Sequence, residues 1–97
     1  MCASALRVEL HIPAVHSLKE KRAVLRPLVE GMRKRWSISI AEVDHHDLWQ
    51  RAAIGVAMVA PDPKHLSNLI DDVRRYIDAQ PEVEVVEVSV LSLEEPA

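Results

Sequence analysis

The sequence has little cysteine, little glycine and no long apolar run, and each of these shortages excludes a class of protein or site. Its single cysteine, Cys2, rules out a disulfide framework and a paired-cysteine zinc or redox site. Its two glycines, Gly31 and Gly55, are isolated, so no glycine-rich loop is available to cradle a nucleotide. The longest apolar run, residues 52–60, is far shorter than the roughly 20 residues that a membrane helix needs. No secretion signal is visible either, so we expect a cytoplasmic protein.

The composition is nevertheless that of a folded domain. The chain has 97 residues, of which 48% are hydrophobic and 28% are charged, close to the average for globular proteins. This much apolar surface can offset the entropy lost on ordering, which excludes disorder over most of the chain. We predict a single domain over residues 1–97, with an ordered core from about residue 5 to about residue 92 and a frayed tail from Glu94.

Hydrophobic periodicity predicts six elements. Alternating apolar residues indicate a strand at 5–12, and a Ser17/Glu20 capping box begins a helix that runs to Trp36, with a kink expected at Pro27. Strands are predicted at 38–43, 50–60 and 83–91, and a second helix begins after Asp62 and ends before Pro81. The order β-α-β-β-α-β predicts a ferredoxin-like α+β sandwich (an alpha-beta plait), with antiparallel sheet order 4-1-3-2 and both helices on one face.

Three motifs in this order resemble a known bacterial family. Ser17–Arg22 (SLKEKR), Ser39–Glu42 (SIAE) and Trp49–Arg51 (WQR), the last followed by Ile54–Ala57 (IGVA), resemble the YlxP-like family, a domain of unknown function, over roughly residues 5–90. The resemblance implies a ferredoxin-like fold. It also implies work near the ribosome, because genes of the family often lie beside those of a translation initiation factor and a ribosome-maturation factor. It implies no catalytic residue. Pro27 and His46 depart from the pattern.

Positive charge is concentrated in one segment of an otherwise acidic chain. The net charge is −3, yet residues 17–36 hold seven basic and two acidic residues, which gives this segment +5 and the remainder −8. Five of the basic side chains fall within about 120° of the first helix: Lys19, Arg22, Arg26, Arg33 and Lys34. Such a cluster suits a phosphate backbone, so we predict that this helix face binds RNA or a ribosomal particle. The alternative is an ordinary solvated helix face.

The sheet face that the helices leave open is a second candidate surface. Ile54, Val56 and Met58 are expected to face the helices, so the intervening small residues should point outward. We predict that this face joins two copies of the chain through Arg7, Glu9, Ala53, Gly55, Ala57 and Val59. The alternative is a weakly apolar surface without a partner.

Histidines and carboxylates gather at one end of the predicted sheet. His11, Asp44 and His45 are the weak candidates for a metal or acid–base site, the alternative being polar loop residues that shape a turn. We therefore predict a small non-enzymatic domain with no cofactor, membrane or DNA partner. An adaptor that dimerises through its sheet face and a metal-dependent hydrolase remain the alternatives.

Overall fold

The computed structural model describes residues 1–94, so the tail that was expected to fray lies, from residue 95 on, outside the described residues. It has four strands and two helices in the order β-α-β-β-α-β. Their bounds are β1 Cys2–His11, α1 Leu18–Arg35, β2 Ser39–Asp44, β3 Arg51–Ala60, α2 Pro63–Asp78 and β4 Glu84–Glu94. No helix of this part of the chain is long and apolar enough to cross a membrane.

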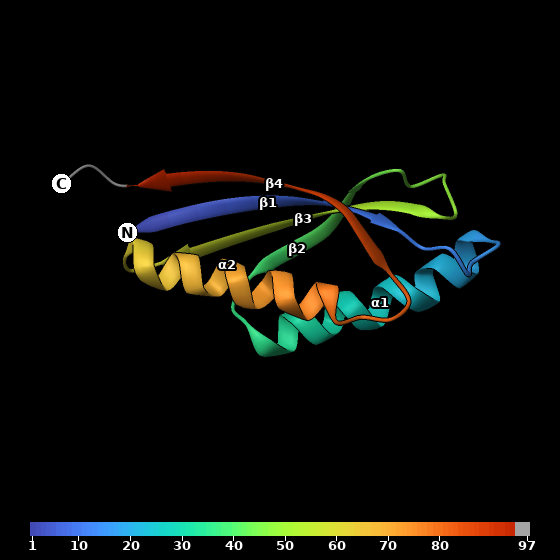
Figure 1. Cartoon of the computed structure of the whole chain (residues 1–97), viewed down its shortest axis with the longest axis horizontal. Helices are drawn as coiled ribbons and strands as arrows, with labels where there is room; N and C mark the ends of the chain where they lie inside the picture. The colour runs from blue at the N-terminus through green and yellow to red at the C-terminus, as the bar shows by residue number, and fades with distance from the viewer. Residues whose placement is uncertain (95–97) are drawn as a thin grey trace.

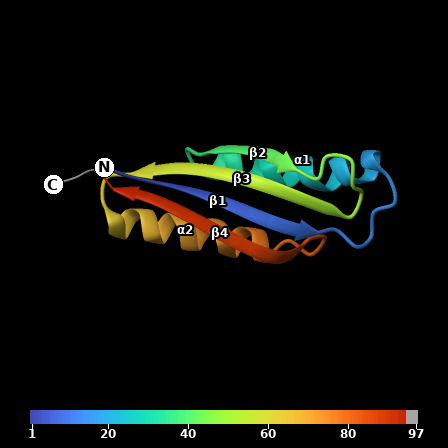
Figure 2. The ribbon, with the colours of Figure 1, turned by 90° about the horizontal axis from the view of Figure 1, so that it is seen from above.

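The four strands form one antiparallel sheet in the order β2-β3-β1-β4. Both helices lie against the same face of this sheet and leave the other face open (Figure 1; Figure 2). The predicted ferredoxin-like sandwich and its strand order are therefore confirmed.

Each helix begins where the sequence places a cap. The Ser17 hydroxyl accepts a hydrogen bond from the Glu20 backbone N–H (3.1 Å), and the Glu20 carboxylate accepts one from the His16 N–H (3.0 Å). The arrangement is a variant of the capping box, in which the Glu20 carboxylate reaches the N–H of the residue before the N-cap. Asp62 accepts from the His65 N–H (2.9 Å), with Pro63 as the first helical residue. Helix α1 runs unbroken through Pro27 from Leu18 to Arg35.

Two strands are longer than the alternation of apolar residues predicts. β1 begins at Cys2 and β4 ends at Glu94, because the first residues of β1 pair with the ends of both β3 and β4. The added segment of β1 consists of small residues, Cys2, Ala3 and Ser4, which give no clear apolar alternation. The pairing that extends these strands is long-range, which is why the local pattern misses it.

The core lies between the sheet and the two helices. Leu6, Val8 and Leu10 of β1 are buried on the helix side, as are the residues that were expected to face the helices, Ile54, Val56 and Met58. Gly31 leaves room for the Tyr76 hydroxyl of α2, which would have to move if position 31 carried a side chain. Trp36 meets the Tyr76 ring edge-on, with 5.5 Å between centroids. These contacts fix α1 in position and thereby the basic residues that it carries.

Candidate functional site

The basic residues of α1 lie mainly at the protein surface. Lys19, Arg22, Arg26 and Lys34 are exposed, and so is Arg33. Arg35 also contributes a charge, and its guanidinium lies 4.8 Å from the centroid of the Tyr76 ring.

Three of these arginines border one groove between α1 and β2. The groove has a volume of about 220 Å³ and combines basic, acidic and apolar side chains: Arg22, Arg26, Arg33, Glu30, Glu42, Leu25, Val29 and Ile54. Ile54 is fully buried and Leu25 nearly so, which gives the groove an apolar floor beneath a charged rim. A planar guanidinium donates two parallel hydrogen bonds to a phosphate, so a rim of this kind can hold an anionic group.

Arg33 is engaged inside the molecule. Its Nη1 donates to Glu30 Oε1 (2.7 Å) and its Nη2 to the Ile40 carbonyl of β2 (2.8 Å). The side chain therefore joins α1 to the edge strand and has fewer donors left for a ligand. The two arginines with the greatest freedom to bind an anion are Arg22 and Arg26.

Lys21 has a structural role that the charge pattern of the sequence did not predict. Its side chain is only 2% exposed, and its Nζ lies 2.8 Å from each of three oxygens: Glu42 Oε2 and the carbonyls of His45 and Leu48. The ammonium group thus donates two hydrogen bonds to loop carbonyls and forms an ion pair with the Glu42 carboxylate. A signal was present in the sequence, because position 21 lies three residues after Leu18 and four before Leu25, on the apolar stripe of the helix. Lys21 consequently fastens the β2–β3 loop to α1 and adds nothing to the exposed basic face.

One end of the open sheet face carries a connected group of charged side chains, which we call the charged half: Arg7, Glu9, Asp44, His45 and Arg51. Glu9 lies at its centre and accepts hydrogen bonds from Arg7 Nε (3.0 Å), His45 Nε2 (2.9 Å) and Arg51 Nη2 (3.4 Å). Arg7 also donates to Asp44 Oδ2 (2.9 Å). The predicted dimer residues Arg7 and Glu9 are therefore bonded to each other within one chain.

These contacts shift the protonation of the charged half. Burial pushes the pKa of Glu9 upward, but hydrogen bonds from Arg7 and His45 outweigh it and hold that pKa below its usual value. The hydrogen bond from Arg7, followed by the one from the His45 backbone, lowers the pKa of Asp44. Hydrogen bonds to Asp44 and then Glu9 raise the pKa of Arg7. All three groups are thus stabilised in their charged forms.

His45 is held by an unusual backbone conformation. Its φ of 62° lies in the left-handed region that non-glycine residues rarely adopt. Its N–H donates to Asp44 Oδ1 (2.7 Å), while its carbonyl accepts from Lys21 and from the Leu48 N–H (3.0 Å). Contacts on both sides of the residue thus offset the cost of the left-handed conformation.

The histidine candidates do not converge on a metal site. His11 Nδ1 lies 3.0 Å from Glu84 Oε2 at the β4 side of the sheet, whereas His45 bonds Glu9 and Asp44 bonds Arg7. Within residues 1–94, no group of three or more histidine, cysteine, aspartate or glutamate side chains is placed to hold a metal ion. His11, Asp44 and His45 lie at the same end of the sheet, but each forms its hydrogen bonds with a different side chain.

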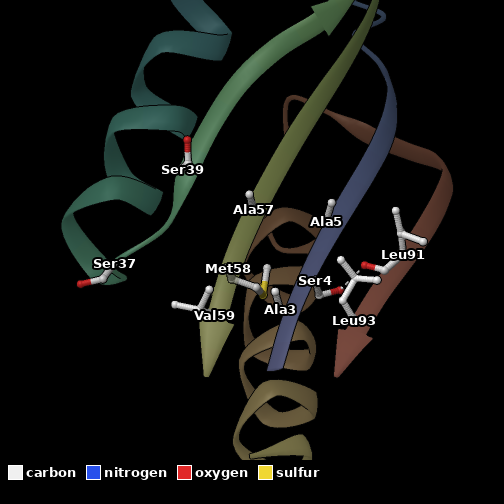
Figure 3. A pocket seen from close by; sticks show the side chains of 10 residues that line it. All are labelled: Ala3, Ser4, Ala5, Ser37, Ser39, Ala57, Met58, Val59, Leu91 and Leu93. Atoms are coloured by element: carbon white, nitrogen blue, oxygen red, sulfur yellow. Dashed lines mark hydrogen bonds between the residues drawn. The ribbon is translucent and has the colours of Figure 1, made fainter. Parts of the chain in front are cut away.

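The opposite end of the open face is apolar. Strand pairing sets Ala3 between Val59 and Leu93, and Ala5 between Ala57 and Leu91. These six residues form what we call the apolar half, and they line a depression of about 440 Å³ together with Ser39 and Ser37 (Figure 3). Leu91 and Leu93 are each 65% exposed, and Val59 is 62% exposed. Ala3 thus lies between two larger side chains, whereas Ala5 has a larger neighbour only on β4.

Two members of the predicted dimer face are less accessible than expected. Ala53 points toward the open face but is 0% exposed, so the expectation that it contacts a partner needs correction. It pairs with Glu9 on one side and Asp44 on the other, and the long side chains of the charged half cover it. Gly55 is half-buried, because Val43 leans over it so closely that an added Cβ would lie 2.9 Å from Val43 Cγ1. Of the small residues named from sequence, Ala57 and Val59 remain open.

These features define a class: a ferredoxin-like domain with a basic helix face on one side and an open, half-apolar sheet on the other. Comparison with known proteins gives the family. The family described as protein of unknown function DUF503 matches residues 4–90, and the chain belongs to it. The chain is also 37% identical over 68 residues to the uncharacterized protein YlxP of Bacillus subtilis (strain 168), covering 70% of this chain and 74% of that protein. The resemblance identified from sequence motifs is thereby confirmed.

Proposed function

We propose that this chain is an RNA- or ribosome-associated interaction module that binds phosphate groups through the exposed basic face of α1. The observation that carries the proposal is the groove between α1 and β2, where Arg22, Arg26 and Arg33 share one rim. Arginines grouped at one groove can contact successive phosphates, and each contact releases condensed counterions.

The arrangement of the remaining charges supports this proposal. Lys21 is neutralised by Glu42 inside the fold, so the surface charge of α1 comes from side chains that point to solvent. The residue that holds the groove together, Arg33, fixes α1 to β2 and so keeps Arg22 and Arg26 in a constant position relative to the edge strand. Binding therefore does not have to order the backbone that carries these two arginines.

The test is binding of a labelled, structured RNA and of purified ribosomal subunits at two salt concentrations. If three or four phosphates are contacted, affinity for RNA should fall roughly 20- to 150-fold between 50 and 200 mM salt. The double variant Arg22→Glu/Arg26→Glu should lose the binding. Arg33 is left intact, because its replacement would also release α1 from β2.

A matched control changes the same total charge elsewhere. Lys64→Glu/Arg74→Glu places two charge reversals on exposed positions of α2, so it alters the net charge equally but leaves the groove untouched. Binding that survives this control and disappears with the α1 variant supports the proposal. Equal losses in both variants indicate attraction to overall charge, and an absence of RNA or subunit binding at low salt overturns the proposal.

A protein–protein contact is the second candidate function, and the apolar half favours it. Leu91, Leu93 and Val59 are exposed although an apolar side chain gains free energy from burial. If neither RNA nor ribosomal subunits bind, this surface becomes the leading candidate.

A further inference from the structure

The two edges of the sheet differ in how well they are protected. β2 has only six residues and a bulge at Val43, which breaks its regular pairing with β3. β4 has eleven residues and pairs regularly with β1 from Glu87 to Glu94, its irregularity being confined to Val86. The outer edge of a strand presents a row of backbone donors and acceptors that another strand can pair with. β4 is therefore the edge that is open to pairing.

Exposed apolar residues occur on both faces of β4. Leu91 and Leu93 point to the open face, while Val90 points to the helix side and is still 48% exposed. The regularly paired stretch from Glu87 to Leu93 contains no lysine, arginine or proline, which often block edge pairing, and Glu87 is its one charged residue. A partner lying flat on the open face would cover the leucines but leave Val90 exposed. A strand added beside β4 would cover both sides.

We propose that β4 pairs antiparallel with β4 of a second copy of this chain, about a two-fold axis at Val90. In this register Val90 lies opposite Val90, Ser89 opposite Leu91, and Glu87 opposite Leu93. Glu87 is thus kept away from the Glu87 of the second copy, where like charges would destabilise the pair. Moving the centre toward the start of β4 would run the pairing into the bulge at Val86 and bring the two glutamates together.

The pairing joins surfaces that already exist on each copy. Directly opposed residues share a face, so the two four-stranded sheets become one of eight strands with all four helices on the same side. The two apolar halves become neighbours, because Leu91 and Leu93 lie next to the junction. The groove between α1 and β2 stays at the far edge of each copy, so this inference is independent of the proposed phosphate site.

The expected affinity is moderate. A pair of edge strands buries less surface than the roughly 800 Å² per partner of a standard stable interface, so we expect dissociation in the micromolar range. Self-association should therefore be measured from about 1 μM to several hundred micromolar.

The experiment compares two valine-to-lysine variants by analytical ultracentrifugation. Val90→Lys places a charge at the proposed junction, and Val59→Lys places the same charge at a somewhat more exposed position on β3, away from β4. We expect a concentration-dependent dimer for the wild type and for Val59→Lys, and at least a tenfold weaker dimer for Val90→Lys. Circular dichroism and thermal unfolding at low concentration confirm that both variants fold.

Hydrogen exchange separates edge pairing from other contacts that involve Val90. Alternate amides between Val88 and Ser92 should gain protection as the wild-type concentration rises, and should not gain it in Val90→Lys. A monomer throughout the concentration range overturns the proposal. So does a dimer that is lost with Val59→Lys, which would place the contact on the open face, or one that brings no added protection to β4.

Discussion

The two halves of the open sheet face differ in whether their side chains already have partners within the chain. In the charged half, Glu9 accepts from three cationic or histidine side chains, and Arg7 reaches both Glu9 and Asp44. In the apolar half, Leu91 and Leu93 are about two-thirds exposed. From the sequence alone the charged residues are candidates for binding a partner, but in the fold they form hydrogen bonds with one another. The apolar residues are the ones that another molecule could still bury.

This difference shows which surface residues of a small domain gain free energy from binding a partner. A charge that has found intramolecular partners gains little from an external one, because binding must first break existing hydrogen bonds. An exposed leucine has no such cost, and its burial contributes about 25 cal/mol for each Å² removed from water. The charged half should therefore govern the stability of the fold, whereas the apolar half adds little to it and stays available to a partner.

The largest effect should come from Lys21, which supports the charged half from beneath. Replacing Lys21 with methionine leaves two loop carbonyls and Glu42 without their ammonium partner, so we expect a loss of about 2–4 kcal/mol in the free energy of unfolding. Urea unfolding followed by circular dichroism measures it. Lys19→Met, at an exposed position of the same helix, is the control and should change stability by less than about 0.5 kcal/mol. Equal effects in the two variants would contradict the role assigned to Lys21.

A smaller and pH-dependent effect is expected from Glu9. Because its pKa is lower in the folded chain than in the unfolded one, the unfolded state binds more protons in acid. Its contribution is fully present above the ordinary carboxyl pKa of 4.5 and is lost as the pH falls through the folded value. Glu9→Gln should cost about 1–2 kcal/mol at pH 7 and flatten the decline in stability between pH 5 and pH 3.

Urea titrations at several pH values test this. Some decline should remain in the Glu9 variant, because the pKa values of Asp44 and Asp62 are also lowered by hydrogen bonds. An unchanged acid slope would show that Glu9 is not the centre of the network.

The boundary between the halves offers a third and weaker test. Gly55→Ala places a Cβ against Val43, which must shift, so we expect a loss of at most about 1 kcal/mol. The loss should shrink in a Val43→Ala background, and a double-mutant cycle measures the coupling. A cost that is the same in both backgrounds would mean that the close approach of Val43 is not its cause.

The smallest effect on folding should come from the apolar half itself. Leu91→Ser removes a side chain that is already 65% exposed, so the free energy of unfolding should change by less than about 0.5 kcal/mol at low micromolar concentration. The backbone carbonyl of Leu91, which accepts from the Ser4 hydroxyl (3.0 Å), is retained. A loss above about 1.5 kcal/mol would show that the apolar half contributes to the monomer core.

Several features could be predicted because they depend on neighbours in sequence. The Ser17 capping box and the Asp62-Pro63 helix start satisfy backbone groups within a few residues, so the residue types alone indicate them. The alternation of β1 and the apolar stripe of α1 each reflect a single element with a fixed period. From these elements the order of the strands followed, because few topologies connect them without crossing.

Other features depended on residues far apart in the chain. From the sequence Arg33 is a free cation, but in the fold it donates a hydrogen bond to the Ile40 carbonyl of β2. From the sequence Ala53 is an open position, but in the fold it is buried between Glu9 of β1 and Asp44 of β2. From the sequence His11 and His45 are possible ligands of one metal ion. In the fold His11 is hydrogen-bonded to Glu84 and His45 to Glu9.

The sequence by itself therefore determined the elements, their order and the concentration of positive charge on α1, because periodicity, capping and charge are local properties of the chain. Which of those charges remain free to bind a ligand depends on the tertiary structure. Whether a side chain finds a hydrogen-bond or ion-pair partner depends on the register of strands that are dozens of residues apart in the sequence. That register neutralises Lys21, connects the charged half and leaves the apolar half and the outer edge of β4 exposed.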